Sequence, residues 1–172
     1  MGRAYTEATA WQYRFFVPHD VNGMIQLFGG KEEFVAALDD IFNTDAEIHG
    51  NLVDITGLIG QYVHGNEPSH HIAYLYNYVG EPWKTQKMSR RLLNEMYHPT
   101  PDGIIGNEDC GQMSAWYILS SMGLYSVCPG SNEYVLTTPL FEKVVVHLAN
   151  GRTLTILAND PQKNIYITKV EL

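Results

Sequence analysis

Three short segments of the 172-residue sequence concentrate side chains that bind ions or transfer protons. They read TEATAWQY at positions 6–13, HGNEPSHH at 64–71 and GNEDCGQ at 106–112. Carboxyl and imidazole groups serve as general acids and bases, and carboxylate, amide and imidazole groups also bind metal ions. The sequence therefore contains candidates for acid–base catalysis, for a metal site, or for both at one place.

The middle segment contains side chains of the kinds that bind zinc, namely His64, Glu67, His70 and His71. Their spacing differs from the HExxH helix of zinc peptidases, and Pro68 interrupts the helical register. Zinc peptidase chemistry is therefore the least favoured interpretation of this segment.

Two other interpretations of the same segment stay open. In one, Asn66 or Ser69 caps the following helix and the histidines form structural hydrogen bonds. In the other, Asn66 and Glu67 present oxygen atoms to a hard cation or to sugar hydroxyls, because calcium accepts carboxylate, amide and backbone oxygens in flexible geometry.

Asp109 in the third segment stands at the start of a predicted helix, where its simplest role is to cap the N-terminus, with Glu108 as a solvated neighbour. Gly106 and Gly111 would allow the backbone to approach a ligand closely. A carboxylate fixed by helix-terminal N–H groups stays ionised, as a general base requires. Asp109 is thus also a candidate general base.

Glu7 in the first segment lies between Tyr5 and Trp11. An apolar wall raises the pKa of a carboxyl group and keeps its proton available, as a general acid requires. The alternative is an exposed glutamate near a frayed N-terminus. Inverting glycoside hydrolysis uses two carboxyl groups roughly 6.5–9.5 Å apart. Glu7 and Asp109 could form such a pair only if the fold brings distant segments together.

The elements that must position these segments change in type along the chain. Apolar spacing, with glycine and proline as breaks, predicts helices at 31–42, 69–79, 83–97 and 109–122. Residue type and spacing predict strands at 133–137, 144–148, 153–157 and 165–170. Asn150-Gly151 is a hairpin turn signal, and the break at 80–82 joins two helices into a pair. We expect a mostly α protein with a C-terminal β segment of short antiparallel strands.

Composition excludes some functions and leaves others open. The net charge of -8 argues against nucleic acid, which attracts clustered Lys and Arg. The start of the sequence lacks the apolar run of a signal peptide, and no stretch is long enough to cross a membrane. Cys110 and Cys128 are too few for a disulfide framework or a cysteine metal site.

Three longer strings closely resemble the C-terminal half of glycoside hydrolase family 92, in the same order and over nearly the whole chain. The strings are YTEATAWQYRFFVPHDVNGMI, DITGLIGQYVHGNEPSHHIAYLYNYVG and GIIGNEDCGQMSAWYILSSMGLYSVCPGSNEYVLTTPLF. This is a family of bacterial exo-acting α-mannosidases, many of them specific for α-1,2 linkages.

The resemblance implies an N-terminal β-sandwich domain followed by an (α/α)6 toroid, with the active site between them. It also implies single-displacement hydrolysis with inversion, and a calcium ion that helps to bind and distort the terminal mannose of a glycan. Family members are usually exported to the periplasm or the cell surface. By this resemblance residues 1–123 are the last helices of the toroid, and residues 124–172 are a closing β segment packed on it.

The resemblance further implies roles for single residues. Glu7 corresponds to the general acid and Asp109 to the general base that activates water. Relatives often have Asp where this sequence has Asn107, which can orient a water or a sugar hydroxyl but cannot share the base role. Asn66 and Glu67 match the calcium-binding segment.

Other positions are implied as contacts around this centre. Gln12 is a further calcium ligand, and Glu47 and His49 approach the leaving-group subsite. The implied substrate contacts, besides Asn107, are Trp11, His64, His70, His71 and Glu108.

A complete toroid and a β-sandwich need far more chain than 172 residues provide. We therefore expect the isolated chain to have little or no activity, because catalytic groups must be positioned around an enclosed substrate. Two other functions stay open: an (α/α)6 enzyme acting on α-glucosides, and an inactive module that binds sugar or assists assembly.

Overall fold

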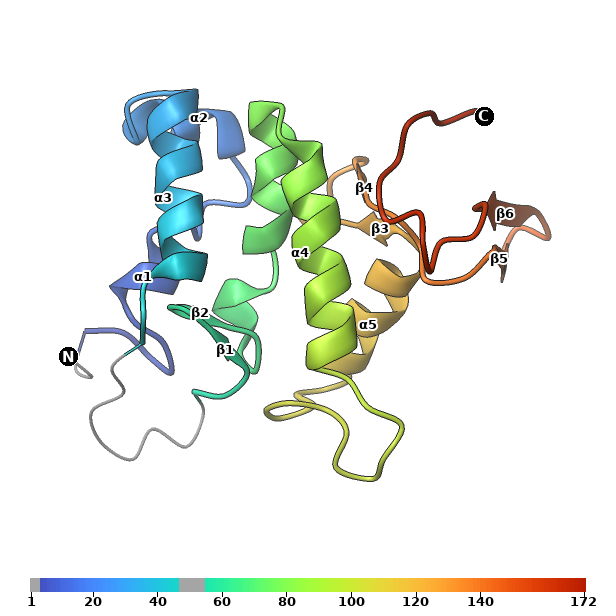
Figure 1. Ribbon diagram of the computed structural model, residues 1–172, viewed down its shortest axis with the longest axis horizontal. Coiled ribbons are helices and arrows are strands. Elements are labelled where there is room, and N and C mark those ends of the chain that lie inside the picture. Colours follow the sequence, from blue (N-terminus) through green and yellow to red (C-terminus); the bar gives the residue numbers. More distant parts are fainter. Residues whose placement is uncertain (1–3, 47–54) are drawn as a thin grey trace.

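The computed structural model describes residues 4–46 and 55–172, and Figure 1 shows a body of helices from which the C-terminal strands extend to one side. The helices are α1 (Ala10–Tyr13), α2 (Val21–Leu27), α3 (Lys31–Asn43), α4 (Pro82–Glu95) and α5 (Gln112–Ser121), with the 3₁₀ helices η1 (Glu67–Ser69) and η2 (Ile72–Val79). The strands are β1 (Leu58–Ile59), β2 (Tyr62–Val63), β3 (Leu124–Tyr125), β4 (Val135–Leu136), β5 (Lys143–His147) and β6 (Thr153–Leu157). This is the predicted fold class, mostly α with short antiparallel strands toward the C-terminus.

Helix α3 forms where the sequence predicted a helix. Glu32 and Glu33 lie in its first turn, where the helix dipole favours negative charge. The side chains at helical spacing face the core: Phe34, Ala37, Leu38 and Ile41. The amphipathic pattern therefore sufficed to locate this helix.

The 3₁₀ helix η2 packs against both α3 and α4. It occupies most of the helix predicted at 69–79, but it begins only at Ile72, after the separate turn η1 that contains Pro68. Six of its eight side chains are buried, so it lacks the single apolar stripe of a surface α-helix. Gly80 ends η2 in the left-handed conformation, which confirms the predicted break between the two helices.

A polar contact on the flank of this packing joins three helices. Asp39 of α3 accepts a hydrogen bond of 2.9 Å from the Tyr76 hydroxyl of η2. The same carboxylate forms a salt bridge of 2.7 Å with Lys84 of α4. These bonds fix the order α3, η2, α4 that Figure 1 displays.

The C-terminal strands form two antiparallel pairs, β3 with β4 and β5 with β6. The predicted Asn150-Gly151 turn joins β5 to β6, with the Gly151 N–H donating to the Leu148 carbonyl at 3.0 Å. The strand predicted at 133–137 is present only as the two residues of β4. A further pair, β1 with β2, was not predicted from the sequence.

The strand predicted at 165–170 is wrong, because its backbone bonds to side chains instead of to a neighbouring strand. The Thr138 hydroxyl donates to the Ile165 carbonyl at 2.6 Å. The Ile167 N–H donates to Oε1 of Gln86 at 3.0 Å. The tail is thereby attached to α4 and to the loop after β4. Whether residues 1–123 and 124–172 form separate units stays a prediction.

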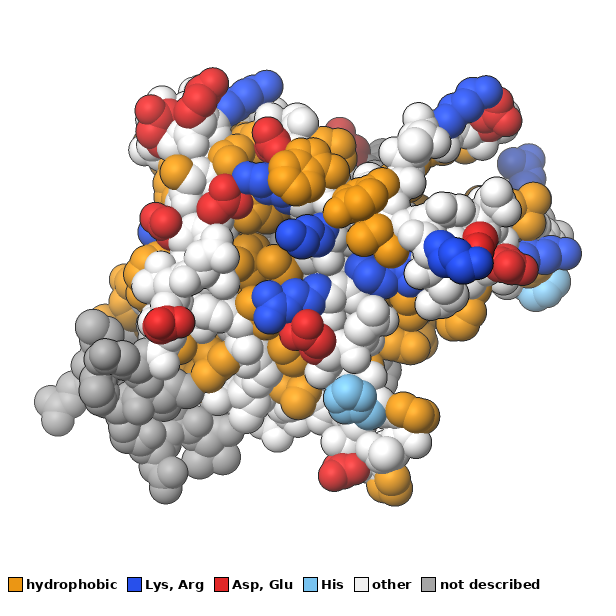
Figure 2. Space-filling model, in the orientation of Figure 1, with side chains coloured by type: hydrophobic (Ala, Val, Ile, Leu, Met, Phe, Trp, Pro, Cys, Tyr) orange, Lys and Arg blue, Asp and Glu red, His pale blue; other side chains and the backbone are white. Residues whose placement is uncertain are grey.

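The space-filling view in Figure 2 shows the C-terminal arm standing away from the helical body. Several of its apolar side chains are exposed, among them Leu157 at 72% and Val170 at 55%. In the part of the chain that the structure describes, no helix is long and apolar enough to span a membrane.

We expect Leu38→Ala to lower the free energy of unfolding by about 2–5 kcal/mol, because it leaves a cavity at a fully buried position. Leu27→Ala is the matched control, since Leu27 is 87% exposed and its truncation is expected to cost less than about 0.5 kcal/mol. Urea unfolding followed by circular dichroism measures both. Equal losses for the two variants would contradict the described core.

Candidate active site

The three polar segments meet at one end of the helical body. The pKa of Glu67 is raised by its burial, by the charge of Asp109 and a hydrogen bond with it, and by the charge of Glu7. The Asn66 side chain also donates a hydrogen bond of 2.5 Å to the Glu7 carbonyl. The fold thus gathers the predicted acid, the predicted base and a predicted calcium ligand.

Two glycines bring the second and third segments together. A Cβ added at Gly106 would lie 2.3 Å from the Gly65 carbonyl oxygen, so the two backbones are in direct contact. Gly106 also has φ of +76°, which glycine adopts without the cost that a Cβ imposes. This contact places the loop before α5 beside the segment that contains Glu67.

Glu108, and not Asp109, caps helix α5. Its Oε1 accepts a hydrogen bond of 3.0 Å from the Ser114 N–H. Its Oε2 accepts one of 2.8 Å from the Ser114 hydroxyl. The expected cap by Asp109 is therefore wrong, and Gly111 occupies the N-cap position without a side-chain bond. The Asp109 carboxyl bonds Glu67 instead.

The N-terminal segment is held by its own polar contacts. Thr9 and Gln12 form a capping box around α1. The Tyr13 hydroxyl donates to the Thr6 carbonyl at 3.0 Å, and its ring stacks on Tyr5 at a centroid distance of 5.3 Å. Glu7 itself is exposed, so the apolar wall expected around its carboxyl group is absent from the described structure.

The carboxyl group whose pKa is raised is that of Glu67, which the sequence predicted as a ligand for a cation or for sugar hydroxyls and not as the general acid. Trp11 is half-buried, with the Arg14 guanidinium 4.4 Å above its ring. Neither Asn66 nor Ser69 caps the 3₁₀ helix that follows it. The capping part of that interpretation is therefore wrong.

Backbone strain marks two of the candidate residues. Glu7 has φ of 53° and Asp109 has φ of 42°, both in the left-handed region. This region is unfavourable for residues with a Cβ, and such outliers concentrate at functional sites. The strain supports a functional role for both carboxylates.

Gln12, the third predicted calcium ligand, has its amide engaged within the fold. Its Oε1 accepts hydrogen bonds from the N–H and the hydroxyl of Thr9, at 2.7 and 2.9 Å. Its Nε2 donates to the Gln61 carbonyl. These contacts give Gln12 a structural role, and its role as a calcium ligand stays a prediction.

His64 is fully buried between two tyrosines. Its Nδ1 bonds the Tyr62 hydroxyl at 2.9 Å, and its Nε2 bonds the Tyr97 hydroxyl at 2.8 Å. Burial, with a smaller contribution from the charge of His70, lowers its pKa to about 3. A neutral imidazole in this place supports neighbouring segments, and as placed it has no surface for a sugar.

His70 links the middle segment to helix α5. Its Nε2 donates to the His64 carbonyl at 2.9 Å, which leaves Nδ1 to accept from the Gln112 amide at 3.2 Å. The Trp116 indole donates to the His70 carbonyl at 3.0 Å. Burial lowers the pKa of His70 to about 4, although the bond to the His64 carbonyl opposes this shift.

His71 is buried as well, and its Nε2 bonds the Phe15 carbonyl at 2.7 Å. Its pKa is also lowered, chiefly by burial. The three histidines thus form structural hydrogen bonds, as one of the open interpretations held. Their predicted contact with a sugar is not supported by this placement.

The structure describes Asn107 but not the other two predicted site residues. Asn107 is exposed, and its contact with a sugar stays a prediction. Glu47 and His49 lie outside the described residues. Among residues 4–46 and 55–172, no group of three or more His, Cys, Asp or Glu side chains is arranged to hold a metal ion.

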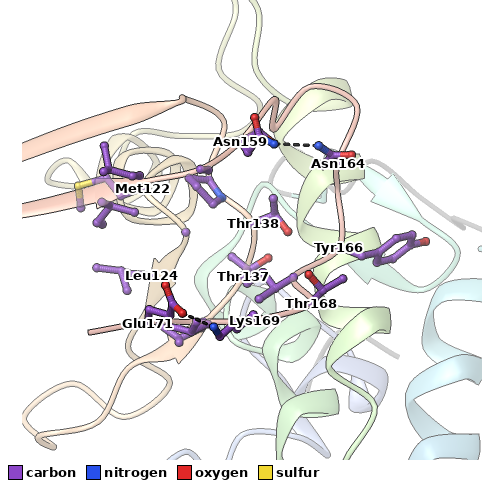
Figure 3. Close-up of a pocket in the computed structure, with 18 of the residues that line it drawn as sticks. Met122, Leu124, Thr137, Thr138, Asn159, Asn164, Tyr166, Thr168, Lys169 and Glu171 are labelled. Carbon is purple, nitrogen blue, oxygen red and sulfur yellow. Dashed lines mark hydrogen bonds and ion pairs between the residues drawn. The ribbon is translucent and has the colours of Figure 1, made fainter.

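A pocket of about 1050 Å³ lies at the C-terminal arm, between β6, the loop after β4 and the tail (Figure 3). The Asn164 amide donates to the Asn159 carbonyl across its rim, and Lys169 pairs with Glu171. None of its described lining residues belongs to the three polar segments. The convergent carboxylates, and not this pocket, therefore define the candidate active site.

The chain matches the glycosyl hydrolase family 92 catalytic domain over residues 1–172. It is similar to a family GH92 alpha-mannosidase from Bacteroides thetaiotaomicron, solved in complex with mannoimidazole, at 45% identity and a TM-score of 0.84 over 89% of this chain and 20% of that one. It is similar to a family GH92 inverting mannosidase from the same organism at 40% identity and a TM-score of 0.76, over 91% of this chain and 22% of that one.

A curated relative, an uncharacterized secreted glycosidase from Arthroderma benhamiae, is 33% identical over 96% of this chain and 20% of its own length. The fold and these matches make the chain part of a glycoside hydrolase catalytic domain. The chain belongs to glycosyl hydrolase family 92. It spans about a fifth of the length of the relatives that it matches.

Sequence reasoning missed the residues that hold the site together. Gly65 and Gly106 were visible as glycines in polar segments, but the sequence does not show that they touch. The Glu108–Ser114 pair, six residues apart, matches no capping pattern, and nothing in the sequence indicates the bond between Gln112 and His70.

We expect Gly106→Ala to destabilise the chain more than Gly80→Ala. Both glycines have positive φ, so each alanine is expected to cost about 1–2 kcal/mol in strain. A Cβ at Gly80 meets no atom within 4 Å, whereas one at Gly106 collides with Gly65. Urea unfolding of both variants isolates the cost of the collision, and equal losses would contradict the backbone contact.

We expect the free energy of unfolding to fall as the pH drops from about 6.5 to about 4. In this window His70 is protonated in the unfolded chain and neutral in the folded chain. Proton binding therefore stabilises the unfolded state relative to the folded state. The contribution of one histidine is about 1.4 kcal/mol per pH unit. His70→Gln is expected to flatten the dependence by this amount, and His98→Gln, at an exposed position, is the control. Urea unfolding across pH 4–7 measures it, and parallel curves for wild type and His70→Gln would refute the prediction.

Proposed function

We propose that this chain is the C-terminal part of an exo-acting α-mannosidase that hydrolyses terminal α-linked mannose with inversion. Glu7 is the general acid and Asp109 the general base. The main observation behind the proposal is that Glu7, Glu67 and Asp109 come together from three separate segments. The charges of Glu7 and Asp109 both contribute to the raised pKa of Glu67. Its membership of glycosyl hydrolase family 92 supplies the reaction class.

In the proposed reaction Asp109 accepts a proton from a water molecule, whose oxygen attacks the anomeric carbon. Glu7 donates its proton to the glycosidic oxygen, so the leaving group departs as an alcohol. The exposed position of Glu7 suits a residue that must meet the leaving group at the mouth of the site. Glu67 lies beside this pair, and the charges of Asp109 and Glu7 contribute to its raised pKa.

The donor chemistry of this site fits a calcium ion. Glu67 offers a carboxylate among like charges, which a cation would relieve, and the Asn66 side chain offers an amide oxygen while its nitrogen bonds Glu7. We assign Asn66 and Glu67 as ligands, with Gln12 as a third only if its amide leaves the capping box. When bound, calcium supplies positive charge that holds sugar hydroxyls. Asn107 is the proposed sugar contact beside it, with Trp11 at the opposite segment.

The proposed substrate is a mannose-containing glycan such as an N-glycan, with an α-1,2 linkage at its terminus. Similarity to solved alpha-mannosidases supports this class. A bacterial origin and export to the periplasm or cell surface are part of the same proposal, and the secreted relative supports the export. The remaining toroid helices and the N-terminal β-sandwich complete the enclosure around the sugar.

We expect the longest polypeptide that the gene encodes to release mannose from α-1,2-mannobiose, and the 172-residue chain alone to release little or none. A calcium chelator is expected to abolish the release, and added calcium to restore it. Mannose release, followed by chromatography with and without chelator, measures both. Release of glucose from α-glucosides instead would favour the alternative enzyme.

Glu7→Gln and Asp109→Asn are each expected to lower kcat by about 10²–10⁴-fold, because each removes one proton transfer. Glu133→Gln, at an exposed position outside the three segments, is the control. Mannose binding without any turnover by the wild-type polypeptide would favour a sugar-binding module. A wild-type kcat in both variants would show that Glu7 and Asp109 are not the catalytic pair.

A further inference from the structure

Three consecutive residues before helix α5 have positive φ. The angles are 42° at Asp109, 58° at Cys110 and 86° at Gly111. A left-handed turn is unfavourable for residues with a Cβ, and only Gly111 is exempt. The turn therefore needs external contacts to persist.

Glu108 supplies those contacts at the entry to the turn. Its two carboxylate oxygens accept hydrogen bonds from the N–H and the hydroxyl of Ser114, at 3.0 and 2.8 Å. Ser114 belongs to the first turn of α5, so the bonds span the left-handed residues and tie both ends of the turn together. The Gln112 N–H closes the turn by donating to the Asp109 carbonyl at 3.1 Å.

The contact of Gly106 with Gly65 places Asp109 beside the segment that contains Glu67, and the Asp109 carboxyl contributes by charge and hydrogen bonding to the raised pKa of Glu67. If the helix began at position 109, as the sequence predicted, the Asp109 carboxylate would bond the free N–H groups of the first turn. The left-handed turn and the occupation of that cap by Glu108 together direct Asp109 away from the helix.

We infer that Glu108 and Ser114 are positioning residues, whose paired hydrogen bonds hold the left-handed turn that presents the Asp109 carboxylate to Glu67. The inference rests on the proposed function for its catalytic consequence. It replaces the expectation that Glu108 contacts the sugar, because both oxygens of Glu108 are bonded to Ser114.

The kinetic test uses the longest encoded polypeptide and α-1,2-mannobiose. Glu108→Ala is expected to lower kcat by about 10²-fold and to leave KM within about twofold, because a misplaced base slows the reaction without removing a sugar contact. Ser114→Ala loses one of the two bonds and is expected to fall between wild type and Glu108→Ala. Glu108→Gln keeps an oxygen for the Ser114 N–H and is expected to retain most of kcat.

A second substitution separates the cost of the left-handed backbone from the loss of the Glu108 hydrogen bonds. Cys110→Gly removes a Cβ from the left-handed turn, so in the Glu108→Ala background it is expected to recover about tenfold of kcat. Cys110→Gly alone is expected to leave kcat unchanged. A rise in KM at constant kcat in Glu108→Ala and Glu108→Gln would overturn the inference, because it would make Glu108 a sugar contact.

A readout independent of activity is available in the 172-residue chain. A residue with positive φ gives an intense intraresidue HN–Hα nuclear Overhauser effect. Asp109 and Cys110 are expected to lose this signal in Glu108→Ala and to keep it in Glu108→Gln. Retention in Glu108→Ala would overturn the inference whatever the activity. If the wild-type polypeptide cleaves no α-mannoside, the proposed function fails, and the nuclear Overhauser effects still decide whether Glu108 holds the turn.

Discussion

The candidate site depends on a contact between two stretches of bare backbone. Gly65 and Gly106 approach so closely that any side chain at Gly106 would enter the carbonyl oxygen of Gly65. The contact sets the separation between the segment that holds Glu67 and the loop that holds Asp109. The same approach lets the Gln112 amide on one side reach the His70 ring on the other.

The site places charged groups outside and neutral polar groups within. Glu7, Glu108 and Asp109 are exposed, whereas His64 and His70 are buried and kept neutral by the cost of burying charge. Buried neutral imidazoles with both nitrogens hydrogen-bonded form a rigid support for the site at low electrostatic cost.

The sequence correctly predicted those helices and turns that depend on neighbouring residues alone. The amphipathic spacing of Phe34 and Leu38 located α3, and Asn150-Gly151 located the hairpin. Elements with distant causes were missed or misjudged. The segment 165–170 alternates like a strand, yet its backbone bonds the side chains of Thr138 and Gln86. The three polar segments were identified, but their internal roles required the tertiary contacts.

The bond between Asn66 and Glu7 uses the carbonyl of Glu7 and leaves its side chain out of the attachment. Every amino acid carries that carbonyl, so another residue that tolerates the left-handed backbone at position 7 would keep the attachment. Under the proposed function, a single-nucleotide change from a glutamate to a glutamine codon would remove the general acid and leave the chain path in place. Such a variant of the longer polypeptide would then bind an α-mannoside without cleaving it, which would make it a means of trapping intact substrates.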